Sequence, residues 1–476
     1  MEITSSFNSG SKIKLVLLGF AINPESPEKQ NQDIINDLLS SCTSTDDYIN
    51  RISDLAGRFV FIFSLNSRKY VIHDMCGLRT VYYSINDEGL FIASQPLLFN
   101  NLFEIKPSEN YKTYIGSEHY KNDIEYWIPT GLTLYDNVKQ LVPNHYLDVA
   151  ADEQIRFWPV KKIEKQDLTK ATAKSANMLE RLILSAKNRF KLALPVTAGW
   201  DSRILLAASK DLLKDFFVYT LQYRWLVDKS PDIKIPKYML RRFKTPFNKL
   251  DCRMEMNPEF YKTYKSNVDF AHDDYAKITN GMIDKFPQDR VVLRGNVSEI
   301  VRCSFYPDGK HDEITSADQL LANWPEWNDI PFIMEYLENW MNSVKEMCKE
   351  YNVDILDLWY MELFMGAWMA QGQLEWDIIH EEFTPYNYRP LIETMLGVPI
   401  KYRLHHKPVL YQKILKHLWP ELLYWPINPP SWNKRHQFKY FIANLSKKAG
   451  LYSFGREVYR IIYPAYLKLK GYKKNW

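Results

Sequence analysis

The chain has 476 residues, of which 46% are hydrophobic and 25% are charged, and its formal net charge is +4 at pH 7. This length predicts two domains. The small net charge argues against a nucleic-acid-binding protein, which concentrates far more positive charge. The five cysteines are scattered and form no CxxC pair, so we expect neither a zinc site nor a disulfide framework, and a reducing, cytoplasmic compartment fits best.

The first part of the chain, residues 1–158, is predicted to form one domain built mainly of strands. Its opening residues are polar and lack a signal-peptide core. The early apolar run Leu15–Ile22 is too short to span a bilayer and is interpreted as a buried strand. Short segments rich in β-branched and aromatic residues follow, separated by turn residues: Arg58–Leu65, Tyr70–Ile72, Val81–Ser84 and Leu90–Ala93. Their close spacing predicts antiparallel sheet layers.

The pattern changes after a charged run near Lys161, and residues 165–430 are predicted to form a second domain. Thr169–Phe190 has the apolar spacing of a helix, with Asp167 as its cap. The alternation continues with a buried strand at Leu192–Val196, a helix at Ser202–Leu212 and another strand at Phe216–Leu221. Alternating strands and helices predict a doubly wound α/β domain. From about residue 320 we expect a helical extension, and residues 431–476 read as a basic helical tail.

One turn in this second domain has the composition of a phosphate cradle. A buried strand leads into small residues and then into the first turn of a helix, and the six positions are Thr197, Ala198, Gly199, Trp200, Asp201 and Ser202. Small residues let backbone N–H groups approach phosphate oxygens, and a helix N-terminus adds positive potential. The GxxxxGK[ST] spacing is absent, so this is not a Walker A motif. A plain strand-to-helix connection with an Asp cap has the same composition, and both interpretations stay open here.

The turn also resembles the pyrophosphate-binding loop of ATP pyrophosphatases, SGGxDS, with two conservative departures. Further segments in the same order resemble asparagine synthetases. They are Ser230–Ile233, then Val291–Glu299, which is similar to the third strand and SGEGxDE loop of that family, and Lys407–Leu410, with Pro420–Leu423 close behind. The resemblance implies an ATP-pyrophosphatase domain of the HUP-like type.

The N-terminal part is similar to the class II glutaminase domain that precedes the synthetase domain in this family. The resemblance lies in His73–Arg79 with Tyr82-Tyr83, in Phe91–Ser94, and in the hairpin from Thr133 to Leu147. It implies the antiparallel sheet layers of an Ntn-hydrolase-like domain. Together the motifs run in order from about residue 55 to about residue 425, and they identify the chain as a member of the asparagine synthetase superfamily.

Two segments depart from the family pattern. Class II amidotransferases use an N-terminal cysteine as nucleophile, whereas position 2 is Glu2, so we expect no glutaminase activity. The acidic loop of the third strand is reduced to Gly295-Asn296-Val297-Ser298-Glu299, with one acid where two usually stand. Without glutaminase activity, the N-terminal domain would serve as a structural remnant, a docking surface or part of a tunnel wall. Cys76 is interpreted as a core residue.

The resemblance implies ATP and Mg²⁺ as cofactors and assigns roles to individual residues. ATP pyrophosphate would bind residues 197–202, with Gly295 letting the backbone pass close to the ribose or adenine. Asp201 and Asp232 would be Mg²⁺ ligands, because hard cations favour carboxylate oxygens. Glu299 and Lys407 would be catalytic, with Lys407 neutralising charge that builds on pyrophosphate or on the acyl group.

Each of these residues also has a structural interpretation that stays open. Glu299 would form an i,i+3 ion pair with Arg302 on a helix. Asp232 would be a helix N-cap. Lys407 would be a solvated surface lysine. The neighbouring histidines His405 and His406 lack the further ligands that a metal site needs.

The expected activity is ATP-dependent adenylation of a small-molecule or peptide carboxylate, followed by amide formation with ammonia or an amine. Lasso-peptide cyclases and β-lactam synthetases are members of this kind. The alternative is a catalytically inactive scaffold or binding subunit. A partner protein fits either reading. The tail from residue 447 to 476 carries eight Lys or Arg against one Glu, which fits peripheral contact with an anionic membrane or an exposed solvated helix.

Overall fold

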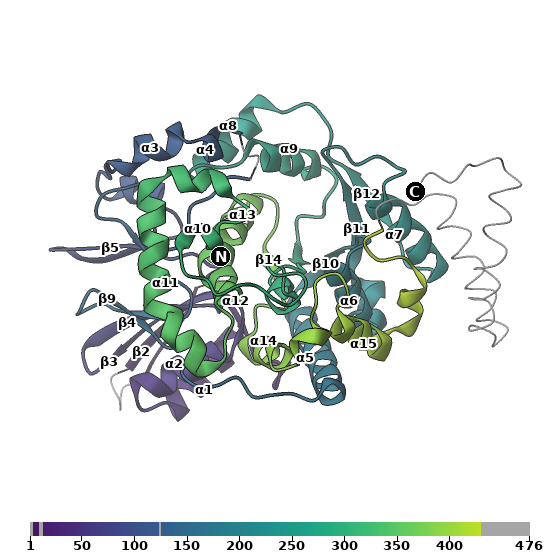
Figure 1. The fold of residues 1–476 in the computed structure, drawn as a ribbon, viewed down its shortest axis with the longest axis horizontal. Helices are drawn as coiled ribbons and strands as arrows, with labels where there is room; N and C mark the ends of the chain where they lie inside the picture. Colours follow the sequence, from purple (N-terminus) through teal and green to yellow (C-terminus); the bar gives the residue numbers. More distant parts are fainter. Residues whose placement is uncertain (1–2, 9–12, 123–124, 430–476) are drawn as a thin grey trace, which may run out of the picture.

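The computed structural model describes residues 3–8, 13–122 and 125–429. The predicted basic tail and its membrane contact therefore lie outside the described residues, as does Glu2. Figure 1 shows a mixed α/β molecule in which the N-terminal strands lie on one side and a parallel sheet with its helices on the other. None of the described helices combines the length and the apolarity that crossing a bilayer requires.

The N-terminal part contains two antiparallel sheets. The larger sheet has the order β1-β2-β3-β4-β8-β9, and the smaller one has the order β6-β5-β7. The strands are β1 (Ile3–Asn8), β2 (Ile13–Ile22), β3 (Ala56–Leu65), β4 (Arg68–His73), β5 (Tyr82–Asn86), β6 (Gly89–Ala93), β7 (Lys139–Gln140), β8 (His145–Asp148) and β9 (Glu153–Arg156). The helical segments of this part are α1 (Asn31–Ser41), α2 (Thr45–Ser53), η1 (Pro96–Asn101), α3 (Asn110–Gly116) and α4 (Glu118–Asn122).

Alternation along the strands explains how these layers stack. One face of the large sheet, including Phe59, Phe61 and Phe63, packs in a single core with Ile35 of α1 and Tyr48 of α2. The opposite face carries Val60 and Val71, which share another core with Val81, Tyr83 and Leu141 around the small sheet. The order of layers is therefore helices, large sheet, small sheet, and the prediction of antiparallel sheet layers is confirmed.

The C-terminal part is built on a five-stranded parallel sheet with the order β12-β11-β10-β13-β14. Its strands are β10 (Lys191–Pro195), β11 (Phe217–Gln222), β12 (Asn248–Asp251), β13 (Arg290–Leu293) and β14 (Glu382–Phe383). Helix α5 (Leu168–Arg189) precedes β10. The helical segments between the strands are α6 (Trp200–Ala208), η2 (Lys210–Asp215), α7 (Pro231–Arg242), α8 (Pro258–Asn267) and α9 (Asp273–Met282).

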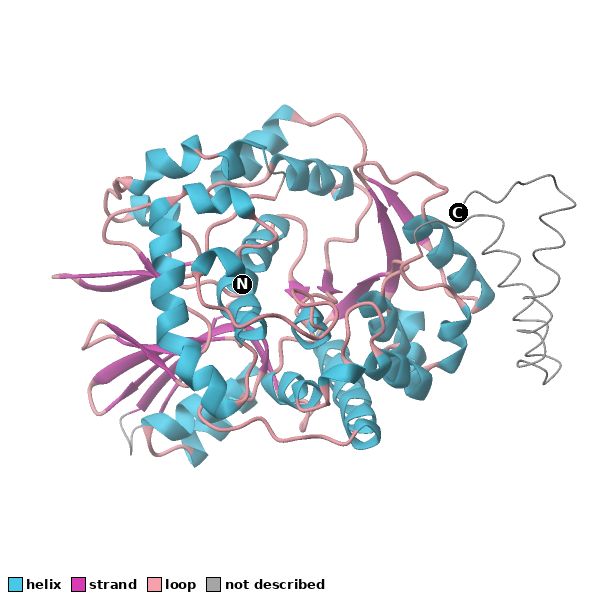
Figure 2. Cartoon of the chain, in the orientation of Figure 1, coloured by secondary structure: helices cyan, strands magenta, loops and turns pink. Residues whose placement is uncertain are grey.

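Helices cover both faces of this parallel sheet (Figure 2). Leu192 and Leu194 share the main core with α5 and α6, whereas Ala193 shares a separate core with Ile278 of α9 and with Trp376. As predicted, Asp167 caps α5, because its carboxylate accepts the backbone N–H groups of Thr169 and Lys170. The chain leaves β10 in one direction to build β11 and β12, then returns to add β13 and β14 on the other side. That reversal between β10 and β13 is where open α/β sheets bind ligands.

The region predicted to be helical from about residue 320 is mainly helical, and helical segments already begin with η3 after residue 295. Strand β14 was not predicted, because it has only two residues. The segments are η3 (Ser298–Arg302), α10 (Ala317–Leu320), η4 (Pro325–Asp329), α11 (Pro331–Tyr351), α12 (Ile355–Trp359), η5 (Tyr360–Met369), α13 (Ala370–Trp376), α14 (Arg389–Leu396), η6 (Ile400–Tyr402), α15 (Val409–Leu418) and η7 (Pro420–Tyr424).

A buried charged cluster joins the two parts of the molecule. Arg58 of β3, whose side chain is 1% exposed, pairs with Asp377 and Glu381. Arg79 donates to both oxygens of Glu381, at 2.8 and 2.9 Å. Asn387 continues the contact by donating to the Asp74 carboxylate at 2.7 Å. We call Arg58, Arg79, Asp377 and Glu381 the interdomain clamp. It lies next to β14 and ties the N-terminal sheet to the parallel sheet.

Candidate functional site

The predicted phosphate cradle forms the connection between β10 and α6. Gly199 occupies the N-cap position of α6, and Trp200, Asp201 and Ser202 form its first turn. Helical N–H groups in a first turn have no partner within the helix, so they point toward any anion placed there. The sequence predicted this arrangement of strand, turn and helix, although the helix ends at Ala208 instead of continuing to Leu212.

Side chains of the cradle already hold its backbone in a defined shape. The Ser202 hydroxyl accepts the Thr197 N–H at 3.1 Å and lies 3.0 Å from the Thr197 hydroxyl. The Thr197 hydroxyl in turn accepts the Gly199 N–H at 3.1 Å. Asn428 donates its N–H to the Ala198 carbonyl at 3.0 Å, so the end of the described chain lies over the same turn. Thr197 and Ser202 are half-buried.

Asp232 supports this turn from the side of β11. It lies in the first turn of α7, where Ser230 is the N-cap residue. Its carboxylate accepts the Ala198 N–H at 2.9 Å. The N-cap interpretation of Asp232 is therefore wrong, because its carboxylate is used by the cradle backbone and Ser230 stands at the cap. Its predicted role as a Mg²⁺ ligand stays a prediction.

The loop after β13 packs directly against the start of α6. A Cβ added at Gly295 would lie 2.8 Å from the Cβ of Asp201, closer than real Cβ atoms approach one another. Gly295 therefore allows the loop and the helix to meet. Val297 has φ of +74°, a left-handed conformation that is unfavourable for a β-branched residue. Strained backbone of this kind is concentrated at functional sites.

Residues about one hundred positions apart meet around the Asp201 carboxylate. Ser298 donates its hydroxyl to one oxygen, and Arg302 donates to the other at 3.0 Å. The same Arg302 nitrogen lies 3.8 Å from the Glu299 carboxylate, so the predicted i,i+3 pair exists but is the weaker of the two contacts. Tyr411 of α15 donates its hydroxyl to the Ser298 carbonyl at 2.7 Å and so holds the loop after β13 against α15. We call Asp201, Ser298, Glu299 and Arg302 the acidic centre.

Glu299 is the unbalanced member of the acidic centre. Burial, and then the neighbouring charge of Asp201, raise its pKa from 4.5 to about 7, although Arg302 lowers it. Its Oε2 atom is buried and has no hydrogen-bond partner in the described part of the chain. The carboxylates of Asp201 and Glu299, the second with an unpaired oxygen, lie beside a helix N-terminus and would supply two oxygen ligands to a hard cation, whose remaining ligands would come from phosphate and water. The residues that fit Mg²⁺ best are thus Asp201 and Glu299.

Lys407 does not join the acidic centre through any polar contact in the described residues. Its side chain is exposed, and it lies in the turn that leads into α15. This exposure agrees with the surface-lysine interpretation. The same turn still borders the site, because burial and the nearby Arg302 lower the pKa of His405, two residues before Lys407. The described ranges contain no group of three or more His, Cys, Asp or Glu placed to hold a metal ion.

The sequence did not single out Ser298 or Tyr411 as site residues. Ser298 falls at an unspecified position of the SGEGxDE pattern, and Tyr411 comes from a helix far along the chain, so spacing alone could not place them. Cys76 is fully buried, as predicted. The five cysteines are all free and buried.

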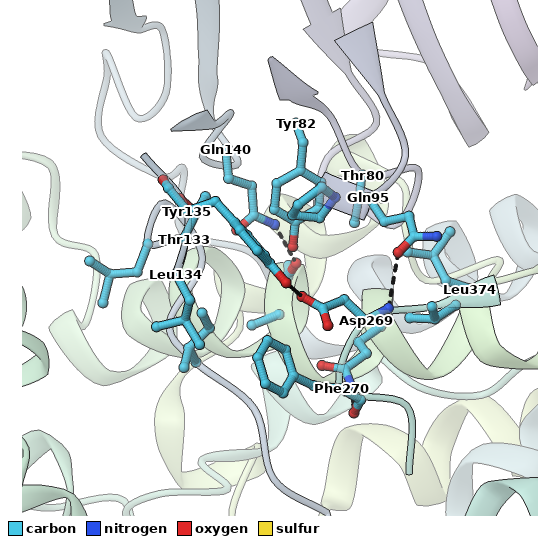
Figure 3. Close-up of a pocket in the computed structure, with 17 residues that line it drawn as sticks. Thr80, Tyr82, Gln95, Thr133, Leu134, Tyr135, Gln140, Asp269, Phe270 and Leu374 are labelled. Atoms are coloured by element: carbon cyan, nitrogen blue, oxygen red, sulfur yellow. Dashed lines mark hydrogen bonds between the residues drawn. The ribbon is translucent and has the colours of Figure 1, made fainter. Parts of the chain in front are cut away.

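A small cavity lies between the N-terminal sheets and the helices of the C-terminal part, as Figure 3 shows. It encloses about 60 Å³, enough for water-sized molecules and too little for a nucleotide. Tyr135 donates its hydroxyl to Asp269 at 2.7 Å, and Gln95 accepts the Asp269 N–H at 2.9 Å. Burial raises the Asp269 pKa to about 6.

Comparisons with known proteins add little to this geometry. No protein-family model matches the chain, and no curated protein matches it. One solved structure, of an allosteric regulatory enzyme of purine biosynthesis, is similar over 55% of this chain with 12% sequence identity and a TM-score of 0.22. The similarity spans 60% of that enzyme's chain, which is less than two thirds of its length. What this chain does is therefore inferred from its own residues.

Proposed function

We propose that this chain is an ATP-dependent, AMP-forming amide ligase of the asparagine synthetase type, without a glutaminase of its own. The observation that carries the proposal is the convergence on Asp201: the cradle after β10 and the loop after β13 meet at the switch point of the parallel sheet. A scaffold has no need to bring these segments together at the place where such sheets bind ligands.

In this proposal the N–H groups of the first turn of α6 and the hydroxyls of Thr197 and Ser202 hold the pyrophosphate part of ATP. Asp201 and Glu299 hold Mg²⁺, which supplies charge neutralisation for the phosphates. Gly295 keeps the loop clear of a bulky side chain at its closest contact with α6. The helix terminus and these side chains are in place before the substrate arrives, so little reorganisation is needed when charge develops.

The chemistry is one substitution at phosphorus and one at carbon. A substrate carboxylate oxygen bonds to the α-phosphorus while the bond to pyrophosphate breaks. The nitrogen of ammonia or an amine then bonds to the acyl carbon, loses a proton, and AMP leaves. Positioning does most of the work in such phosphoryl transfers. Lys407 is proposed to close over the leaving pyrophosphate from the exposed turn before α15.

One observation favours the second candidate, an inactive scaffold. Both oxygens of Asp201 are already engaged by Ser298 and Arg302, and Val297 stands where the SGEGxDE pattern has its second glycine. The left-handed φ of Val297 shows, however, that the backbone keeps the conformation that glycine favours. The absence of glutaminase stays an expectation from the sequence, because position 2 lies outside the described residues.

ATP–pyrophosphate exchange across a panel of carboxylates tests the proposal. Exchange by the wild type with at least one acid, reduced by 10²-fold or more in Asp201→Ala, is the expected result. A matched control is Asp211→Ala, on the exposed η2 segment beyond the same helix. The scaffold is the better account if no acid supports exchange and calorimetry detects no binding of ATP with Mg²⁺.

A further inference from the structure

A second cavity of about 220 Å³ opens at the carboxyl edge of the parallel sheet, beside the acidic centre. Leu221 and Tyr223 line it from the end of β11, and Arg294 and Asn296 from the end of β13. Asn296 follows Gly295 directly, so the rim of this cavity shares the loop after β13 with Ser298 and Glu299 of the acidic centre. We call this cavity the ring pocket.

Aromatic rings make up much of the ring pocket wall. Tyr223, Tyr275, Trp368 and Trp376 all line it. They come from four different elements or loops on the face of the sheet covered by α9 and α13. Aromatic side chains offer large, flat apolar surfaces and favour stacked or edge-to-face partners. The wall therefore suits a planar ring better than a flexible aliphatic chain.

Two arginines and three carboxylates surround the ring pocket, and each arginine is paired. Arg294 donates to Glu382 at 2.7 Å, and its guanidinium lies 4.5 Å from the ring centre of Trp376. Arg224 donates to Asp274 at 2.5 Å and also pairs with Glu125. With both arginines already paired, the pocket presents no spare positive charge for a phosphate or a carboxylate. An anionic group is therefore expected outside it, toward the cradle.

One hydrogen-bond acceptor in the wall remains unused. Glu382 is 1% exposed, and while its Oε1 atom accepts from Arg294, its Oε2 atom has no partner in the described part of the chain. A buried acceptor without a partner costs free energy that a ligand donor would restore. An N–H or O–H group on a bound ring is the simplest such donor.

Resting on the proposed function above, we propose that the ring pocket binds an uncharged aromatic ring of the acyl substrate that carries one N–H or O–H donor. The carboxylate of that substrate faces the cradle across Asn296. The volume fits one ring system and is below the 300–1,000 Å³ typical of pockets for drug-sized ligands. The substrate class is thus an aromatic carboxylic acid, either free or as an aromatic residue of a peptide.

The base of ATP shares this ring chemistry, so the test must separate the two sources. Indole serves as the probe because it has the ring and the N–H donor but no carboxylate or phosphate. Its binding is measured by saturation-transfer NMR on the full chain, with and without saturating ATP and Mg²⁺. No turnover is needed, so failure of the adenylation proposal and failure of this one give different results.

Two variants fill the pocket by different amounts. Ile278→Trp adds bulk to a lining position of α9. Gly372→Ala adds only a methyl group, which would lie 3.3 Å from the Tyr275 ring. Leu184→Trp, at an exposed position of α5, is the matched control. Circular dichroism and thermal unfolding check that each variant folds. If Ile278→Trp does not fold, Gly372→Ala still tests the proposal.

The proposal expects indole to bind the wild type and the control, to bind Ile278→Trp at least five-fold more weakly and Gly372→Ala more weakly, and to be unaffected by ATP. Absence of indole binding to the wild type would overturn it, as would equal binding to wild type and both filled variants. Displacement of indole by ATP would also overturn it, because the ring pocket would then belong to the nucleotide base.

Discussion

The interdomain clamp and the acidic centre are both clusters of arginines and carboxylates, but their charges are balanced differently. In the clamp, two arginines meet two carboxylates, and both oxygens of Glu381 accept from Arg79. In the acidic centre one arginine serves two carboxylates, and a Glu299 oxygen has no partner in the described residues. Burial raises the pKa of Asp377 in the clamp, as it does that of Glu299 in the acidic centre, whereas the pKa of Glu381 is lowered because Arg58 and Arg79 outweigh its burial.

This difference separates a structural ion cluster from a site that is ready for a ligand. A buried charge needs a partner, and a cluster that is already neutral gains little from a further ion. A cluster with one excess carboxylate gains from a cation, whether a proton or a metal. The clamp therefore holds β14 against the N-terminal sheet, and the acidic centre is where we propose that Mg²⁺ binds with a nucleotide.

The largest expected effect on stability comes from breaking the clamp. Arg58→Met removes a guanidinium that is 1% exposed and pairs with both Asp377 and Glu381. These carboxylates are 25% and 27% exposed, so we expect a loss at the lower end of the about 3–5 kcal/mol of unfolding free energy that breaking a buried ion pair costs. Urea unfolding followed by circular dichroism measures the loss. Arg51→Met, on the exposed side of α2, is the control and should shift the curve little. Equal losses of unfolding free energy in the two variants would show that the clamp contributes no more to stability than an exposed arginine does.

Breaking the acidic centre should cost less and respond to metal. Arg302→Gln removes the shared arginine, but Ser298 still donates to Asp201, and Glu299 can take up a proton because its pKa is raised. We expect a loss of roughly 1–3 kcal/mol, partly restored by millimolar Mg²⁺. The same Mg²⁺ should leave Arg58→Met unchanged. Rescue of both variants, or of neither, would contradict the distinction between the two clusters.

Glu299 should give the acidic centre a pH dependence of its own. Its folded pKa, about 7, lies above its ordinary value of 4.5, so between these values the folded protein binds more protons than the unfolded chain. Stability then falls as pH rises through this window, by on the order of 1–3 kcal/mol, with the full cost present above pH 7. Thermal unfolding between pH 5 and pH 8 should show a shallower fall in Glu299→Gln than in the wild type. Parallel curves would mean that Glu299 keeps its ordinary pKa.

Lys407 should have the smallest effect on stability and a distinct effect on rate. Because its side chain is exposed, Lys407→Ala should change unfolding free energy by less than about 0.5 kcal/mol. If it closes over the leaving pyrophosphate, ATP–pyrophosphate exchange should fall about 10²-fold. Lys413→Ala, an exposed position of α15, is the control. Exchange rates that match in the two variants would leave Lys407 as a surface residue.

Sequence reasoning located the cradle and the sheet that carries it because both have local signatures. A buried run, small residues and an Asp in the next turn fix the β10–α6 connection, and Asp167 marks the start of α5. It could not place Arg302 on Asp201, since that contact depends on how β13 lies beside β10. It also misread Asp232, whose carboxylate accepts the backbone N–H of Ala198 in the turn after β10. Ser230 could have been read as the cap, because it stands directly before Pro231.

The central claim is that the acidic centre accepts Mg²⁺ with ATP, and proton release tests it most directly. Calorimetric titration of the wild type with ATP and Mg²⁺ at pH 7, in buffers of different ionisation enthalpy, counts the protons released. With the Glu299 pKa near 7, a metal that replaces its proton should release about half a proton more in the wild type than in Glu299→Gln. Binding without Mg²⁺ dependence, or equal proton release by both proteins, would contradict the account.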